Sequence, residues 1–322
     1  MNRLSRSWIR FETKRPDVGS TESKMPSRSD SKPSCIGLLA GWGQYPLIVA
    51  RQLKQQGHAV VCCGIRGHAD PALEAICDDF RWVGLTRFAG QVRFFRRHGV
   101  TDATMAGKIF KTNLFRKYGW LIHLPDLLFW RYFYKHFITK SRNRNDDSLL
   151  GNVVQLFADH GIRFGPATDY APELLVKNKT LTKNTLTDYQ WRDVQFGWML
   201  AKEMGRLDVG QTVAVKGRAV IAVEAVEGTD ECIARAGSLC TSGGFTVVKV
   251  AKPEQDMRFD VPTIGVGTLE TISKAGGKVL AIEAEKTIIL EEDKVIDFAN
   301  RNGMVVAAFS DSQMNQTLRK SA

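Results

Sequence analysis

The charged residues best suited to chemistry gather in one stretch of the sequence, which carries two lysines, two aspartates and an arginine: Lys249, Lys252, Asp256, Arg258 and Asp260. The stretch overlaps the end of the β-branched run 245–250, which predicts a buried strand, and prolines on both sides of the acids disfavour a helix. If the loop is extended, Asp256, Arg258 and Asp260 face one side, because side chains alternate along an extended chain. Carboxylates bind Mg²⁺ or act as a base, while arginine and lysine bind phosphate oxygens. The alternative is a polar loop that contains a structural Arg–Asp pair.

A second polar group occupies a predicted turn between a strand and a helix, at Glu227, Thr229 and Asp230. Its two acids are further candidates for chemistry. A purely structural interpretation makes Asp230 an acid in the first turn of the helix and Thr229 the helix cap. Both interpretations stay open at this stage.

The composition predicts a cytoplasmic protein with two domains. The chain has 322 residues, of which 43% are hydrophobic and 25% are charged. Its net charge of +11 indicates an anionic partner, which is nucleic acid, an anionic membrane surface or a phosphorylated ligand. No apolar run is long enough to span a bilayer. The six cysteines form no CxxC pair, and this pattern is typical of reduced thiols rather than of a disulfide framework or a zinc site.

The first half of the chain predicts a mostly parallel sheet covered by helices. Residues 1–34 lack apolar periodicity, so we expect a disordered basic extension and not a signal peptide. A short apolar strand then leads to Gly41 and Gly43 and to a helix with proline in its first turn. Glycines there let a backbone approach a pyrophosphate, but the third glycine of a dinucleotide fingerprint is absent. A nucleotide-cradling turn and a merely tight turn therefore stay open. Strands alternate with helices to about residue 168, with Gly107 ending a further strand.

The stretch 110–144 interleaves aromatic and basic residues at helical spacing. Such a helix can lie in a membrane interface, with aromatic rings at the level of the headgroups and basic residues on anionic lipid. The candidates for this contact are Trp120, Trp130, Arg131, Tyr132, Tyr134 and Lys135. The alternative is a core helix whose Lys and Arg reach solvent. A nucleic-acid surface is disfavoured, because no helix-turn-helix or zinc pattern accompanies the stretch.

The second half predicts a separate α/β domain over residues 188–322, after a linker at 169–187. A long helix at 188–204 is followed by a β-hairpin around Gly217 and a helix from about residue 231. The charged stretch, a helix at 267–275, two further strands and a helix at 291–301 come next. A last strand at 305–309 is expected to close the chain.

Several motifs together resemble the LpxI-type UDP-2,3-diacylglucosamine pyrophosphatases. They are GLLAGWG at 37–43, NDDSLL at 145–150, GRLDVGQ at 205–211, AVEAVEGTD at 222–230 and QDMRFDVPTIG at 255–265. They occur in the same order as in that family and cover all but the N-terminal extension. The resemblance implies a Rossmann-like N-terminal domain, a distinct C-terminal α/β domain and a substrate enclosed between them.

The resemblance also implies a lipid A pathway hydrolase that splits UDP-2,3-diacylglucosamine into its 1-phosphate and UMP with Mg²⁺. The critical aspartate of the family falls on Asp260. Phosphoryl transfer depends on positioning and charge neutralisation, which suits Asp260 with Asp256 and Arg258 as catalytic residues. Asp260, Glu227 and Asp230 are the predicted metal ligands. The predicted substrate-binding residues are Gly41, Gly43, Thr229, Lys249, Lys252 and Thr263. Because no Ser-His-Asp or Cys-His order is present, water is the expected nucleophile.

Two other functions compete with this one. A non-catalytic protein that binds a nucleotide sugar or a phospholipid would use the same acids structurally, and release of UMP would distinguish the two. A Rossmann-type oxidoreductase is weakened by the incomplete glycine fingerprint. The expected partners of the hydrolase are the nucleotide-linked diacyl sugar and an anionic membrane surface, with no nucleic acid and a possible homodimer. The expected location is the cytoplasmic face of the inner membrane.

Overall fold

The computed structural model describes residues 34–109, 124–138, 146–253, 256–258 and 261–321. Asp260, Trp120 and the predicted basic extension up to residue 33 lie outside these described residues. No helix in this described part of the chain is both long and apolar enough to cross a bilayer.

Five parallel strands form the sheet of the N-terminal domain, in the order β3-β2-β1-β4-β5. They are β1 (Cys35–Ala40), β2 (Ala59–Ile65), β3 (Asp79–Val83), β4 (Asp102–Ala106) and β5 (Arg163–Gly165). The order reverses direction between β1 and β4, which is the switch point where ligands of such sheets bind. The sheet confirms the predicted parallel α/β domain.

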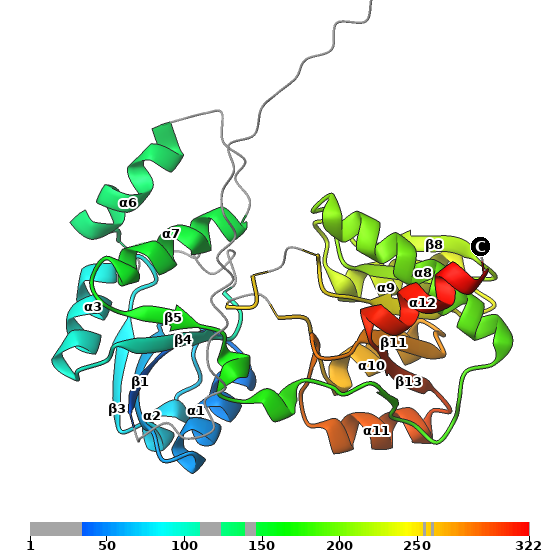
Figure 1. The fold of residues 1–322 in the computed structure, drawn as a ribbon, viewed down its shortest axis with the longest axis horizontal. Coiled ribbons are helices and arrows are strands. Elements are labelled where there is room, and N and C mark those ends of the chain that lie inside the picture. Colours follow the sequence, from blue (N-terminus) through cyan, green and yellow to red (C-terminus); the bar gives the residue numbers. More distant parts are fainter. Residues whose placement is uncertain (1–33, 110–123, 139–145, 254–255, 259–260, 322) are drawn as a thin grey trace, which may run out of the picture. The chain divides into compact units, whose positions relative to one another are not determined.

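Helices cover both faces of this sheet (Figure 1). They are α1 (Tyr45–Gln55), α2 (Leu73–Ile76), α3 (Phe88–Arg97), α6 (Leu127–Ile138) and α7 (Asp146–Ala158). Alternate residues of β2 supply both cores, because successive side chains of a strand point to opposite faces. Val61 and Cys63 pack with the α3, α6 and α7 side, whereas Val60 and Cys62 pack with α1 and α2.

A six-stranded mixed sheet forms the C-terminal domain, in the order β6-β13-β11-β9-β7-β8. Its strands are β6 (Lys179–Thr180), β7 (Thr212–Lys216), β8 (Ala219–Val223), β9 (Thr246–Lys249), β11 (Val279–Glu283) and β13 (Val305–Phe309). The central three, β9, β11 and β13, are parallel, and β7 runs antiparallel to both β9 and β8. Consequently β8, β9, β11 and β13 all end at the same edge. A separate pair, β10 (Thr263–Ile264) and β12 (Ile288–Ile289), is parallel.

Two hydrophobic cores hold this second sheet between helices (Figure 1). The helices are α8 (Asp188–Arg206), α9 (Thr229–Leu239), α10 (Val266–Lys274), α11 (Glu292–Arg301) and α12 (Asp311–Ser321). Residues of α9, α10 and α11 pack on one face, and residues of α8 and α12 pack on the other. A capping box fixes the start of α8, where Thr187 and Gln190 exchange hydrogen bonds.

Two features of this half of the chain were not predicted. The predicted linker at 169–187 contains a 3-10 turn at Pro172–Leu174 and the strand β6, which pairs antiparallel with β13. The C-terminal sheet therefore begins before residue 188. The chain also continues beyond β13 into α12, whose Met314 is fully buried. Neither the two-residue strand β6 nor the largely polar helix α12 has a strong sequence pattern.

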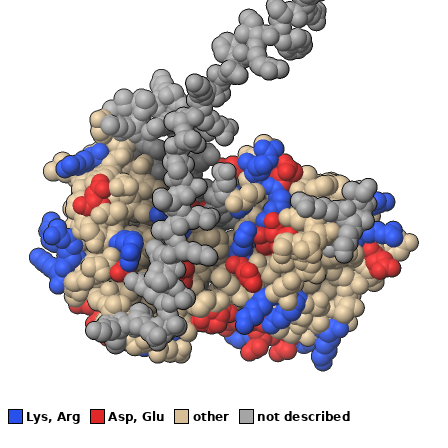
Figure 2. Space-filling view, viewed as in Figure 1, with Lys and Arg blue, Asp and Glu red and all other residues tan. Residues whose placement is uncertain are grey.

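The charge of the protein is distributed over the visible face. Figure 2 shows Lys and Arg side chains interspersed with Asp and Glu side chains among the residues that are coloured. Among these coloured residues, the basic side chains do not form one continuous surface on this face.

Candidate functional site

A chain of buried polar groups lies where strands of the C-terminal sheet end. Lys249 is the last residue of β9, Glu224 follows β8, and Thr229 is the first residue of α9. The Lys249 Nζ donates to Thr229 Oγ1 at 2.9 Å, and Thr229 Oγ1 donates to Glu224 Oε1 at 2.9 Å. Lys249 is 7% exposed and Glu224 is 8% exposed. A buried charge is tolerated only when it is hydrogen-bonded and paired with an opposite charge. The Thr229 hydroxyl meets this requirement, because it bonds both the Lys249 ammonium group and the Glu224 carboxylate.

Two helices begin beside this chain of polar groups. Gly228 precedes α9 with φ of +88°, a backbone conformation that glycine adopts without strain. Gly265 precedes α10, and α9 packs against α10. Lys249 and residues from both helix starts line one hollow. A helix start presents unpaired backbone N–H groups and a positive dipole end, and both favour an anion such as phosphate.

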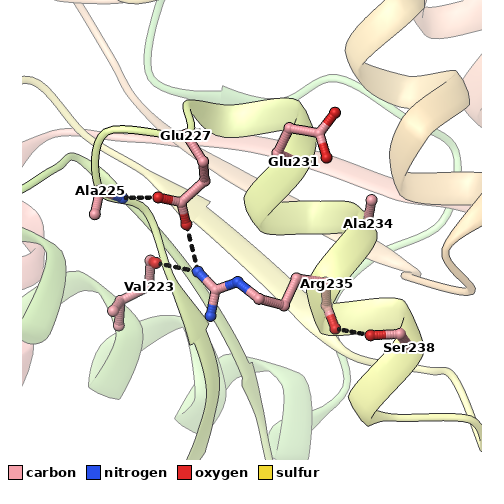
Figure 3. Close-up of a pocket in the computed structure, with 7 residues that line it drawn as sticks. All are labelled: Val223, Ala225, Glu227, Glu231, Ala234, Arg235 and Ser238. Carbon is pink, nitrogen blue, oxygen red and sulfur yellow. Dashed lines mark hydrogen bonds and ion pairs between the residues drawn. The ribbon is translucent and has the colours of Figure 1, made fainter.

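Glu227, a predicted metal ligand, forms an ion pair with Arg235. Its Oε1 accepts from Arg235 Nη2 at 2.5 Å, and the same nitrogen donates to the carbonyl of Val223 at 2.8 Å (Figure 3). Backbone hydrogen bonding and Arg235 hold the pKa of Glu227 below its ordinary value. The pair therefore ties α9 to the end of β8.

The described part of the charged loop, residues 256–258, is not extended. Met257 and Arg258 form a turn, in which the Arg258 backbone N–H donates to Asp256 Oδ1 at 3.0 Å. The guanidinium also binds the carboxylate, with Nη2 2.5 Å from Oδ2 and Nε 2.9 Å from Oδ1. Burial raises the pKa of Asp256, but the bonds from Arg258 outweigh it and leave the pKa below its usual value. The structural Arg–Asp pair, which the sequence left open, is present.

The other predicted residues of this region are spread over different contacts. Lys252 Nζ donates to Asp208 Oδ1 at 2.6 Å near the surface. Thr263 Oγ1 donates to the carbonyl of Val261 at 2.9 Å. Asp230 is an exposed residue in the first turn of α9.

Magnesium was predicted from the same acids, and the described residues do not form a site for it on their own. Among them, no three His, Cys, Asp or Glu side chains are grouped to hold a metal ion. Glu227 is paired with Arg235, and Asp256 is paired with Arg258. A carboxylate that already accepts from a guanidinium has less capacity left for a cation, so the predicted role of Glu227 conflicts with its partner.

At the switch point of the N-terminal sheet, Gly41 and Gly43 have different surroundings. The turns after β1 and β4 cross closely: Trp42 N donates to Lys108 O at 2.8 Å, and Lys108 N donates to Trp42 O at 3.0 Å. A Cβ on Gly41 would lie 2.7 Å from the carbonyl oxygen of Lys108, whereas a Cβ on Gly43 would meet nothing within 4 Å. Gly41 is therefore required by the contact between two turns, and Gly43 faces open space at φ of +107°.

Glu224 is the main site residue that the sequence reasoning missed. Its signal was its position, because it follows the last residue of the apolar strand β8 and precedes the turn that carries Thr229. The exposed Glu227 was chosen instead, since sequence spacing does not distinguish a buried acid from a surface acid three residues away.

These features define a two-domain α/β protein whose C-terminal domain offers helix starts and a buried lysine to an anionic ligand. Residues 35–174 match the LpxI N-terminal domain, and residues 177–307 match the LpxI C-terminal domain. The chain belongs to the LpxI family. It is 28% identical over 281 residues to "UDP-2,3-diacylglucosamine pyrophosphatase LpxI" of Caulobacter vibrioides (strain ATCC 19089 / CIP 103742 / CB 15), covering 84% of this chain and 96% of that protein.

Proposed function

We propose that this protein is a hydrolase of lipid A biosynthesis that cleaves UDP-2,3-diacylglucosamine to 2,3-diacylglucosamine 1-phosphate and UMP. The observation that carries the proposal is the match of both domains to LpxI, together with a relative whose name states this pyrophosphatase activity. The buried Lys249 beside the start of α9 supports it, because a pyrophosphate needs positive charge and backbone donors.

In the proposed reaction, water adds to one phosphorus while the bond from that phosphorus to the bridging oxygen breaks. Lys249 and the starts of α9 and α10 bind phosphate oxygens and neutralise the charge that develops on them. Thr229 fixes the direction of the Lys249 ammonium group through its hydroxyl. Arg258, held in place by Asp256, supplies a second positive charge. Asp260 accepts the proton that the attacking water loses.

Magnesium is part of the proposal, with Asp260 and Asp230 as its protein ligands. A divalent cation bound there would neutralise charge on the two phosphates. Because Glu227 is paired with Arg235, we assign it to holding α9 in place rather than to the metal.

Release of UMP by the purified protein tests the proposal directly. Asp260→Asn keeps the size and hydrogen-bonding capacity of the side chain but removes its charge. We expect turnover to fall by at least about a hundredfold while the substrate still binds, the scale for losing one charge-stabilising group. No UMP from the wild-type protein with Mg²⁺ would favour a non-catalytic binding protein, and near-normal turnover of Asp260→Asn would remove that residue from the reaction.

We further propose that the exposed face of α6 contacts the membrane in which this diacyl substrate resides. The exposed side chains are Leu127, Trp130, Arg131 and Tyr134, with Leu127 at 88% and Trp130 at 48% exposure. Apolar and aromatic groups next to a basic residue suit the interface of an anionic bilayer. A reversible contact of this kind would place the protein on the cytoplasmic face of the inner membrane.

The opposite face of α6 belongs to the protein core, which refines the two alternatives of the sequence analysis. Phe129 and Phe133 stack on Phe88 of α3, with ring centroids 6.2 and 5.7 Å from that ring. Tyr132, one of the predicted membrane residues, donates its hydroxyl to Asp159 at 2.6 Å instead. Lys135 lies among residues whose side chains are not described. A homodimer stays a prediction.

A further inference from the structure

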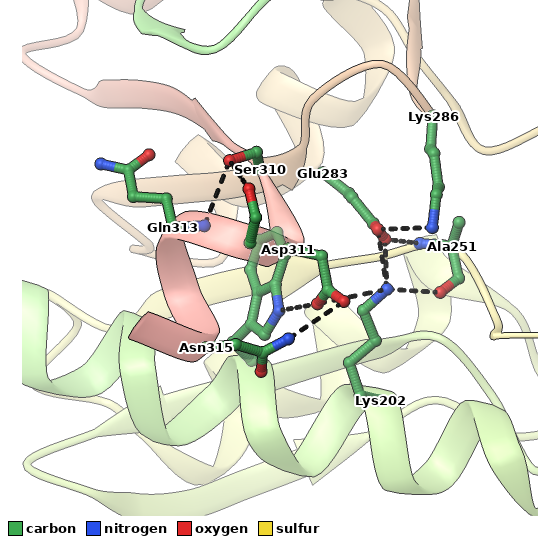
Figure 4. Close-up of polar contacts among 10 residues, drawn as sticks. Lys202, Ala251, Glu283, Lys286, Ser310, Asp311, Gln313 and Asn315 are labelled. Carbon is green, nitrogen blue, oxygen red and sulfur yellow. Dashed lines mark hydrogen bonds and ion pairs between the residues drawn. The ribbon is translucent and has the colours of Figure 1, made fainter. Parts of the chain in front are cut away.

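A second charged cluster, centred on the buried Glu283, lies at the same edge of the C-terminal sheet (Figure 4). Lys202 of α8 places its Nζ 2.7 Å from both carboxylate oxygens of Glu283, the last residue of β11. Lys286 Nζ lies 3.0 Å from Glu283 Oε1, and Asp311 at the start of α12 lies 3.8 Å from Lys202 Nζ. The Glu283 side chain is 1% exposed and that of Lys202 is 16% exposed. None of these residues belongs to the reaction proposed above.

Both backbone groups of one residue, Ala251, are bonded by this cluster. The Ala251 N–H donates to Glu283 Oε2 at 2.8 Å, and its carbonyl accepts from Lys202 Nζ at 3.3 Å. Ala251 comes two residues after the end of β9, so it is the point at which the chain leaves the sheet. The segment that departs there carries Lys252, Asp256 and Arg258.

Stability alone is a weak reason for such a pair. Replacing a buried ion pair by apolar residues is often neutral or stabilising, because removing two charges from water is costly. Apolar residues at these two positions could not bind the backbone of Ala251. Its N–H needs an acceptor and its carbonyl needs a donor, and together these two bonds fix the direction in which the chain leaves the sheet. The ammonium and carboxylate of the pair meet this need.

We infer that Lys202 and Glu283 are positioning residues for the reaction: they fix the origin of the loop that carries Asp256 and Arg258. This inference rests on the proposed function for its kinetic consequence. Its structural content, that the pair holds the loop, can be measured without any turnover. Trp198 and Asn315 extend the cluster, because Trp198 Nε1 donates to Asp311 at 3.1 Å and Asn315 Nδ2 donates to it at 3.2 Å.

The main test uses Lys202→Met and the double variant Lys202→Met with Glu283→Gln in the full chain. Amide hydrogen exchange of peptides spanning residues 251–265 should become faster in both variants, while peptides from β11 and β13 stay protected. We expect kcat to fall by about ten- to a hundredfold with KM changing far less, the scale for a misplaced reacting group. In Lys202→Met the buried Glu283 carboxylate loses its closer cationic partner and keeps the exposed Lys286. The double variant removes that carboxylate charge, so its stability should recover relative to Lys202→Met while its kcat stays low.

Asp193→Asn is the matched control. Asp193 is a buried carboxylate, 5% exposed, that also accepts from backbone N–H groups, those of Gly217 and Arg218 at 3.0 and 2.6 Å. Asp193 belongs to α8 and binds the hairpin turn that follows β7. Because β7 runs antiparallel to β9, this turn lies near the beginning of β9 and not near its end. We expect this variant to lose stability but to keep kcat and slow exchange in the loop.

Unchanged loop exchange in Lys202→Met, or an equal loss of kcat in Asp193→Asn, would overturn the inference. If the wild-type protein releases no UMP, the proposed function fails, but the exchange data still decide whether the pair holds the loop.

Discussion

The carboxyl ends of the strands are built in opposite ways in the two domains. In the N-terminal domain, the turns after β1 and β4 cross so closely that Gly41 and Gly107 have no room for a Cβ. In the C-terminal domain, the corresponding edge is filled by buried charged side chains, those of Glu224, Lys249 and Glu283. One edge is shaped by backbone, and the other is shaped by side-chain charge.

The two edges differ in how well they can stabilise the charge of a reacting group. A backbone crossing gives a ligand a defined surface but few groups that can stabilise charge. Buried lysines held by hydroxyl and carboxylate partners provide fixed charges in a medium of low dielectric, where they act more strongly than in water. For the proposed reaction, we therefore expect the stabilisation of charge to come from the C-terminal domain.

The largest effect is expected from removing the buried charge of Lys249. Lys249→Gln keeps a donor for Thr229 but removes the positive charge, so the rate of UMP release should fall by at least about a hundredfold. The matched control is Lys252→Gln, because Lys252 pairs with Asp208 near the surface and such pairs contribute little. Steady-state kinetics on both variants, with unfolding curves to show that each is folded, would measure the contrast. Equal rates in the two variants would contradict the role proposed for the buried Lys249.

A side chain added where the turns after β1 and β4 cross should lower the free energy of unfolding without changing any charge. Gly41→Ala places a Cβ 2.7 Å from the carbonyl oxygen of Lys108, and such overpacking costs about 1–3 kcal/mol. Gly151→Ala in α7 is the control, because nothing lies within 4 Å of the added Cβ and alanine is the better helix former, by up to about 1 kcal/mol. Urea unfolding should show a lower free energy of unfolding for Gly41→Ala and a higher one for Gly151→Ala than for the wild-type protein. A stable Gly41→Ala protein would mean that the crossing can open.

The two faces of α6 offer a test of the contact assigned to the N-terminal domain. Trp130→Ser with Arg131→Glu changes only exposed side chains and should weaken sedimentation with anionic liposomes at low salt. A basic residue near such a surface contributes about 1 kcal/mol, so reversing one charge and removing an aromatic ring should lower affinity by roughly tenfold or more. Phe133→Ser is the contrasting variant, because Phe133 is in the core and its loss should unfold the domain. Unchanged liposome binding in the folded double variant would place the membrane contact elsewhere.

The smallest effect belongs to the Asp256–Arg258 pair. Because the folded pKa of Asp256 lies below its ordinary value of about 3.9, the pair stabilises the protein above that pH and loses the contribution as pH falls through the folded pKa. The pair is only partly buried, so its contribution should stay below about 1 kcal/mol. Urea unfolding of the wild-type protein and Asp256→Asn should differ at neutral pH and converge in strong acid. A difference that grows on acidification would contradict the lowered pKa.

Most of the fold followed from local patterns. The alternation of apolar runs with helical spacing predicted the parallel N-terminal sheet, and the hairpin around Gly217 was predicted from two β-branched runs with a glycine turn between them. These features depend on neighbouring residues only. Strand β6 and helix α12 were missed, because each is defined by contacts with distant parts of the chain, β6 by β13 and α12 by α8.

The site was predicted less completely for the same reason. Thr229 and Lys249 were selected for their chemistry, and the structure brings them together with Glu224, but sequence alone does not show that a hydroxyl joins a lysine to an acid. The pairing of Lys202 with Glu283 joins residues 81 positions apart. In contrast, Asp256 and Arg258 are close in sequence, and the structural pair between them was among the predicted alternatives.

The short strand β6 has a consequence for the independence of the C-terminal domain. It covers part of the outer side of β13, where Leu181 N donates to Val306 O at 2.9 Å and Thr182 Oγ1 accepts from Val306 N at 3.1 Å. A fragment that began at residue 188 would uncover the backbone of a buried apolar strand. Exposed strands of that kind pair with other chains, so such a fragment would tend to aggregate even with its core intact. We therefore expect β6 and the two residues after it to keep this side of β13 from pairing with another chain.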